Sequence, residues 1–142
     1  MDFAPSFQSE ELNTQGALPI PESLYETISR FGSEHKEVAA VYLFGSRATG
    51  KYRSGSDFDI AVMVRGSIDG MKRVQLETSL SNMLRRDVDV VIFGNATPLL
   101  QHQILTHGQL IFERDPGERI RQEVIARREY LDGLDLYRVI EG

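Results

Sequence analysis

Two aspartates separated by a single residue are the side chains in this sequence best suited to chemistry. Asp57 and Asp59 follow a polar loop and open the apolar run that ends at Val64. Residues two apart on a β-strand project from the same face, with Cα atoms roughly 6.5 to 7 Å apart. Such carboxylates can bridge two divalent cations, which stabilise the attacking and leaving oxygens in phosphoryl displacement. The pair therefore predicts a metal site suited to phosphoryl displacement.

A third carboxylate, Asp89, lies in a later apolar run, DVDVVIF at 87–93. We interpret this run as another strand. A charge between Val88 and Val90 would be costly to bury in an apolar core, and binding to a metal would offset that cost. We predict that Asp57, Asp59 and Asp89 are catalytic and bind metal. An exposed position on the sheet is the alternative for Asp89.

A Gly-Ser turn follows the first strand that the sequence predicts, at 38–44. Gly45 lets the backbone come close to a ligand, and backbone N–H groups with the Ser46 hydroxyl suit the terminal phosphates of a nucleotide. Arg47 would balance the triphosphate charge, because a guanidinium binds phosphate in bidentate fashion. We predict that these three residues bind the nucleotide. Gly45 and Ser46 taken alone are also compatible with an ordinary turn.

Helices and strands are expected to alternate along the chain. Short apolar runs predict four strands, at 38–44, 58–64, 87–93 and 110–113. Apolar residues at helical spacing predict four helices, at 21–32, 70–86, 98–108 and from Pro116 onward. The second helix is expected to turn Met71, Val74, Leu76, Leu80, Met83 and Leu84 inward. Asp69 and Thr97 are expected to cap the second and third helices. The last helix should be the longest, with a capping box at 115–118.

This order predicts an α/β or α+β fold in which helices flank a small mixed sheet of three or four strands. The loop at 46–55 is too short for a usual parallel crossover, which favours an antiparallel first pair and disfavours a Rossmann topology. With 142 residues, the chain has the size of one domain. We predict a flexible arm at 1–18 and a single domain at 19–142.

Composition excludes several classes of protein. A net charge of -5 argues against a protein that coats nucleic acid. With no cysteine, the chain offers no disulfide, thiolate metal site or cysteine nucleophile. No stretch approaches the roughly 18 apolar residues of a membrane span, and the N-terminus does not resemble a signal peptide. We expect a soluble cytoplasmic protein with no direct contact to nucleic acid or membrane.

The segment GSRATGKYRSGSDFD at 45–59 resembles the signature of the DNA polymerase β-like nucleotidyltransferase superfamily, which is Gly-Ser, ten residues, then Asp-x-Asp. It is most similar to the minimal nucleotidyltransferases of the MntA antitoxin group, whose pattern adds Arg-Ala-x-Gly after the serine and Ser-Asp before the second aspartate. The matching residues are Ser46, Arg47, Ala48, Gly50, Ser56, Asp57 and Asp59. The Val-Asp-Val sequence around Asp89 matches the third carboxylate of the family.

The resemblance implies ATP as substrate, two Mg²⁺ ions, and nucleotidyl transfer with release of pyrophosphate. For the antitoxin group it implies adenylylation of a tyrosine on a partner HEPN-domain toxin of the HepT type, held in a hetero-oligomer. In that scheme Gly45 and Ser46 hold the triphosphate, Asp57 and Asp59 hold the metals, and Asp89 completes the metal that activates the acceptor hydroxyl.

Three other interpretations compete with this one. Residues 45–51 fit a phosphate-binding P-loop, but Tyr52 stands where that loop needs Ser or Thr, and the Asp57 and Asp59 pair is left unexplained. The chain could instead mask a toxin without catalysis. It could also modify a small molecule, although only about 50 residues follow Phe93 to build a substrate domain.

The three histidines do not have the sequence spacing of metal ligands. We expect His35, His102 and His107 to be structural or exposed.

Overall fold

The computed structural model describes residues 22–45 and 58–141. Three of the predicted site residues, Ser46, Arg47 and Asp57, lie outside the described residues, as does the predicted arm at 1–18. Gly45, Asp59 and Asp89 lie within them. None of the helices in the described ranges is long and apolar enough to cross a bilayer.

Four strands form one mixed sheet in the order β3-β2-β1-β4. They are β1 (Val38–Phe44), β2 (Phe58–Val64), β3 (Val88–Ile92) and β4 (Gln109–Glu113). Strand β1 is antiparallel to both β2 and β4, whereas β3 is parallel to β2. The predicted mixed sheet and antiparallel first pair are confirmed, and the topology differs from a Rossmann fold.

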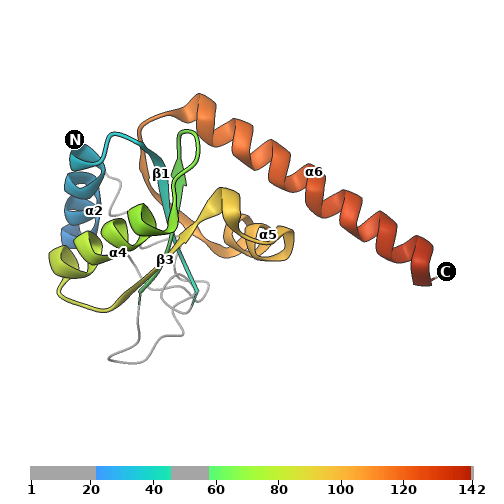
Figure 1. Cartoon of the computed structure of the whole chain (residues 1–142), viewed down its shortest axis with the longest axis horizontal. Coiled ribbons are helices and arrows are strands. Elements are labelled where there is room, and N and C mark those ends of the chain that lie inside the picture. The colour runs from blue at the N-terminus through green and yellow to red at the C-terminus, as the bar shows by residue number, and fades with distance from the viewer. Residues whose placement is uncertain (1–21, 46–57, 142) are drawn as a thin grey trace.

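Helices cover both faces of the sheet (Figure 1). On one face lie α2 (Glu22–Glu34) and α4 (Gly70–Leu84), and on the other lie α5 (Pro98–His107) and α6 (Pro116–Glu141). A short 3-10 turn, η2 (Phe93–Asn95), joins β3 to α5. Figure 1 shows that α6 starts against the sheet and then runs out beyond the rest of the molecule.

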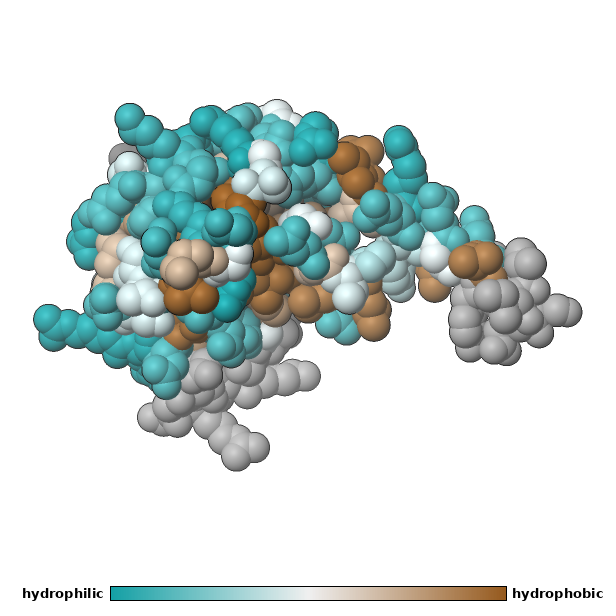
Figure 2. Space-filling view, viewed as in Figure 1, coloured by the Kyte–Doolittle hydropathy of each residue, from teal (hydrophilic) through white to brown (hydrophobic). Residues whose placement is uncertain are grey.

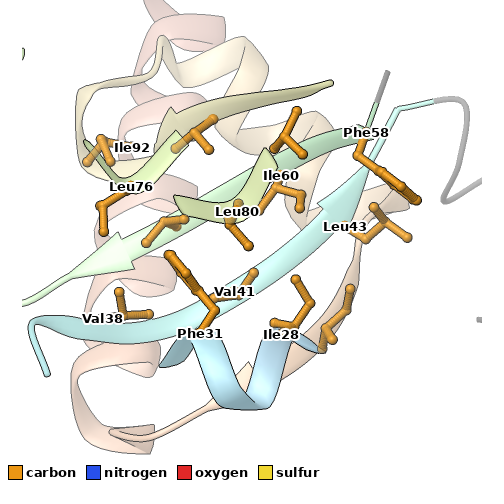
Figure 3. Close-up of a cluster of buried hydrophobic side chains, with 14 of the residues drawn as sticks. Ile28, Phe31, Val38, Val41, Leu43, Phe58, Ile60, Leu76, Leu80 and Ile92 are labelled. Atoms are coloured by element: carbon orange, nitrogen blue, oxygen red, sulfur yellow. The ribbon is translucent and has the colours of Figure 1, made fainter. Parts of the chain in front are cut away.

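The larger core lies between the sheet and the pair α2 and α4 (Figure 3). Ile28 and Phe31 of α2 are fully buried, as are Leu76 and Leu80 of α4, and all four face β-branched residues of the central strands. These contacts follow from the spacing of three or four residues, which aligns apolar side chains along one side of a helix. The core holds β1 and β2 in a fixed register, and that register positions the candidate site.

The structure corrects two predictions about these helices. Met71 and Val74 were expected to face inward, but they are 69% and 44% exposed. Each residue of a helix turns about 100°, so both lie roughly opposite the buried face that Leu76 and Leu80 define. Gly32 was expected to end its helix, which instead continues to Glu34. Gly32 packs against Phe112, whose ring occupies the space that a side chain would need.

The predicted helix caps are confirmed by hydrogen bonds. The Asp69 carboxylate accepts from the backbone N–H of Lys72 at 2.8 Å, and the Thr97 hydroxyl accepts from Leu100 at 3.2 Å. Asp115 accepts from the N–H of Glu118 at 3.1 Å, which is half of the predicted capping box. The other half differs, because the Glu118 carboxylate accepts from Arg121 and Gln122. Hydrogen bonds from Arg121 and then Gln122 lower the pKa of Glu118 to about 2.

Arg114, between β4 and α6, ties three backbone segments together. Its guanidinium donates to the carbonyl oxygens of Gly32 at 2.5 Å, His35 at 3.1 Å and Val38 at 2.7 Å. Carbonyls at the end of a helix lack partners within that helix. We expect Arg114→Ala to lower the free energy of unfolding by about 2 to 4 kcal/mol, because it removes three hydrogen bonds that a charged guanidinium donates.

Urea denaturation followed by circular dichroism measures this effect. Arg128, which is exposed on α6, provides the matched control, since Arg128→Ala should change stability by less than about 0.5 kcal/mol. Equal stability losses in the two variants would show that the carbonyl contacts of Arg114 contribute little.

Candidate active site

Asp59 and Asp89 lie directly opposite each other on neighbouring parallel strands. Each is the second residue of its strand, so both lie at the same end of the sheet. Neighbouring strands are roughly 4.8 Å apart, which places the two carboxylates within reach of one ligand. Their neighbours along the strands pack into the core on the side of α2 and α4. By alternation, Asp59 and Asp89 project from the face that α5 and α6 partly cover.

Gly45 lies beside Asp59 at the end of β1. The preceding residue, Phe44, pairs with Asp59, and Gly45 has a φ of +76°. A Cβ at position 45 would overlap the carboxylate oxygen Oδ2 of Asp59 and lie 3.1 Å from its Cγ. Glycine is therefore needed both for its backbone conformation and for this close approach. The sequence predicted that Gly45 brings the backbone close to a ligand, and the structure shows that it also makes room for a carboxylate.

Asp89 is exposed, whereas Asp59 is half-buried. The Asp89 side chain is on the solvent side of β3 while Val88 and Val90 face the core, so the cost of burying its charge does not arise. That Asp89 binds a metal stays a prediction. What distinguishes it from an ordinary surface aspartate is its register opposite Asp59.

The chemistry of these residues fits a magnesium site. Carboxylate oxygens are preferred ligands of Mg²⁺, and two of them meet at one end of the sheet next to a residue with no side chain. Within residues 22–45 and 58–141, no three His, Cys, Asp or Glu side chains gather closely enough to hold a metal. The third predicted ligand, Asp57, is outside those ranges.

A polar network on the same face ties α6 to the sheet. The Tyr42 hydroxyl donates to the Glu123 carboxylate, and Arg119 donates to Glu123 at 2.8 Å and also to Glu113. Burial, together with the negative charge of Glu123, raises the pKa of Tyr42 above its ordinary value. Tyr42 is only 4% exposed, so it is not an accessible site for modification. The sequence carried no signal for the contact of Tyr42 with Glu123, because these two residues are 81 positions apart in the chain.

The histidine prediction is supported at His102. Its ring stacks on Tyr130 with centroids 3.9 Å apart and planes 4° apart, which joins α5 to α6. His35 contacts the hydroxyl of Ser79 at 3.3 Å. Both rings have structural contacts.

Residues 26–117 match a family model described as Polymerase beta, Nucleotidyltransferase. This match covers more than half of the chain and includes Gly45, Asp59 and Asp89. The chain belongs to this nucleotidyltransferase family. The resemblance predicted from the motif at 45–59 is thereby confirmed at the level of the family.

Individual proteins are also similar to this chain. Protein adenylyltransferase MntA of Shewanella oneidensis is 36% identical over 72 residues, which cover 51% of this chain and 52% of that protein. The chain thus matches about half the length of this relative. A chain in a crystal structure of a toxin-antitoxin with AMP-PNP gives a TM-score of 0.71 at 26% identity, over 82% of this chain and 94% of that one.

A third match shows the shared fold. It is to a chain in the structure of a tri-AMPylated Shewanella oneidensis HEPN toxin in complex with an MNT antitoxin. The TM-score is 0.65 at 24% identity, and the match covers 82% of this chain and 91% of that one. The mixed sheet described above is therefore the nucleotidyltransferase fold.

Proposed function

We propose that this chain is an antitoxin nucleotidyltransferase, which transfers AMP from ATP to a tyrosine hydroxyl of a partner HEPN-domain toxin and so neutralises it. The observation that carries the proposal is the register of Asp59 opposite Asp89, with Gly45 against Asp59, inside the region that matches the family. The relative named as a protein adenylyltransferase and the matched toxin-antitoxin chain with AMP-PNP support the choice of substrate and partner.

Each site residue has a role in this proposal. Asp57, Asp59 and Asp89 hold two Mg²⁺ ions, while Gly45, Ser46 and Arg47 bind the triphosphate. The bound ions would neutralise phosphate charge and polarise the phosphoryl oxygens. The separation of Asp57 from Asp59 by one residue suits this shared role, because side chains two apart on a strand share a face.

The reaction joins the acceptor oxygen to the α-phosphorus of ATP. The bond between that phosphorus and the bridging oxygen of the β-phosphate breaks, and pyrophosphate leaves. The hydroxyl proton passes to the Asp89 carboxylate and then to solvent. Asp89 suits this role because it is the exposed member of the pair and a large acceptor can reach it. Half-buried Asp59 is fixed in place against Gly45 and is suited to hold the phosphate side of the site.

A protein acceptor fits the architecture better than a small molecule. Every described strand belongs to one sheet, and the described helices pack on its faces. This arrangement supports a single domain at 19–142, with the acceptor surface supplied by another molecule. ATP and a ribonuclease toxin would meet such an enzyme in the cytoplasm.

Intact-mass measurement tests the proposal. Purified protein, ATP and Mg²⁺ are incubated with the product of the neighbouring gene as the candidate toxin. We expect that protein to become heavier by one or more adenylates. The modified toxin should lose its ribonuclease activity after it is separated from this protein. An unchanged toxin mass would reject the transfer reaction. Inhibition that requires no ATP would instead show that the toxin is masked.

A further inference from the structure

An exposed apolar stripe runs along α6. Its four apolar side chains are between 37% and 58% exposed and belong to Ile120, Val124, Leu131 and Leu134. Arg127 stands between Val124 and Leu131. The five residues follow one another along the chain at intervals of four, three, four and three residues. This is the spacing of the contact seam in a coiled coil, and it places all five side chains on one side of the helix. Ala126, which packs against residues of the sheet, lies about 100° around the helix from Arg127.

A groove between α5 and α6 lies beside this stripe. A cavity of about 220 Å³ is lined by His102, Leu105 and Thr106 of α5 and by Ala126, Arg127, Tyr130 and Leu131 of α6. The stacked rings of His102 and Tyr130 connect its two walls. Two stripe residues, Arg127 and Leu131, line the cavity, so the stripe and the groove form one continuous surface. Apolar surface is visible beside α5 and along α6 in Figure 2.

The stripe and the groove beside it together suit a helix as the partner. A repeat of seven residues keeps the same side of one helix against another over several turns. Amphipathic helices bind in this way to apolar grooves, through side chains three, four and seven residues apart. The groove decides in favour of a helix, because the spacing alone is also that of a helix packed on a sheet, as in α2.

Arg127 argues against a second copy of this chain as the partner. It stands at the centre of the stripe, with two apolar positions on either side. In a full-register pair of two α6 helices, parallel or antiparallel, one Arg127 would therefore face the other. Like charges at such positions are unfavourable. The Arg127 side chain is 58% exposed and its ion pair with Glu123 is 3.4 Å long, so its guanidinium can bind a carboxylate from a different partner.

We propose that the stripe and the groove of α5 and α6 bind an amphipathic helix of the partner toxin, which carries a carboxylate opposite Arg127. This inference rests on the proposed function for the identity of the partner. Helices α5 and α6 lie on the face of the sheet from which Asp59 and Asp89 project. A toxin bound there lies on the side where its tyrosine must enter.

Leu131→Asp and Leu136→Asp form a matched pair for the test. Both leucines lie on α6 and are similarly exposed, at 58% and 61%, but they are about 140° apart around the helix. Titration of the toxin by calorimetry, without ATP, measures binding alone. We expect Leu131→Asp to weaken binding by about thirty-fold or more, as for a central interface residue, and Leu136→Asp to change it less than about three-fold. Equal affinities for the two variants would overturn the docking surface.

Arg127→Glu tests the charge at the centre of the stripe. It should weaken toxin binding by about ten-fold or more, whereas Arg128→Glu should leave it nearly unchanged. Sedimentation of the free protein tests the alternative partner, since a dimer that Leu131→Asp converts to monomer would assign the stripe to self-association. If the wild-type protein binds the toxin through this surface but transfers no AMP, the proposed function fails and the docking surface stands. If AMP is transferred equally by Leu131→Asp and Leu136→Asp at low toxin concentration, the docking surface fails instead.

Discussion

Replacing Asp59 with asparagine is expected to lower the rate of AMP transfer by about a thousand-fold or more. Asparagine keeps the size of the side chain but removes the negative charge that a magnesium ion needs, and such ions contribute several kcal/mol to phosphoryl displacement. Asp89→Asn should give a loss of similar size, because Asp89 faces Asp59 across the strand pair. Single-turnover formation of adenylated toxin, followed by intact mass, measures both rates.

Two controls separate loss of chemistry from loss of structure. Asp132→Asn changes an exposed aspartate of α6 in the same way and should leave the transfer rate unchanged. Toxin binding without ATP should be the same for Asp59→Asn and wild type, since Asp59 is not on the proposed docking surface. Normal transfer by Asp59→Asn would show that the metal assignment is wrong, whatever its effect on stability.

Gly45→Ala is expected to lower the transfer rate by about a hundred-fold. The added methyl group would overlap the Asp59 carboxylate, so this carboxylate must move from its place opposite Asp89. A displacement of about 1 Å at a catalytic group can cost about a hundred-fold in rate. The positive φ of residue 45 adds strain of about 1 to 2 kcal/mol, which a thermal-denaturation experiment measures separately.

Gly66→Ala provides the control for that backbone strain. Gly66 has a φ of +70°, similar to that of Gly45, but a Cβ at position 66 would meet nothing within 4 Å. Both variants should lose similar stability, and only Gly45→Ala should lose activity. Equal activity in the two variants would show that the contact between Gly45 and Asp59 is not needed for catalysis.

The strands and helix starts were predictable because their signals are local. Short apolar runs indicated all four strands, with ends within one residue of those observed. Asp69, Thr97 and Asp115 marked helix starts because a side-chain oxygen reaches an N–H group three residues ahead. The short first loop limited the topology to an antiparallel pair, since a parallel crossover needs more chain.

The exposed positions were harder to predict, because they depend on what each helix packs against. Met71 and Val74 are as apolar as the buried residues of α4, yet they lie on its solvent side. The apolar residues of α6 were recognised as helical, but the protein body covers only the first part of that helix. The spacing of four and three residues around Arg127 is the same as that of a buried face, so only the tertiary structure shows that this side of α6 is exposed.

The sequence by itself determined the chemistry available to this protein. The Gly-Ser turn, the Asp-x-Asp pair and the later Val-Asp-Val identified the family, because these residue types and spacings match its signature. Tertiary structure decided which residues meet. Only the register of β2 against β3 places Asp89 opposite Asp59, and only the end of β1 brings Gly45 against that carboxylate. Such pairings follow from how the core fixes the strands, and residues 30 positions apart carry no local signal of them.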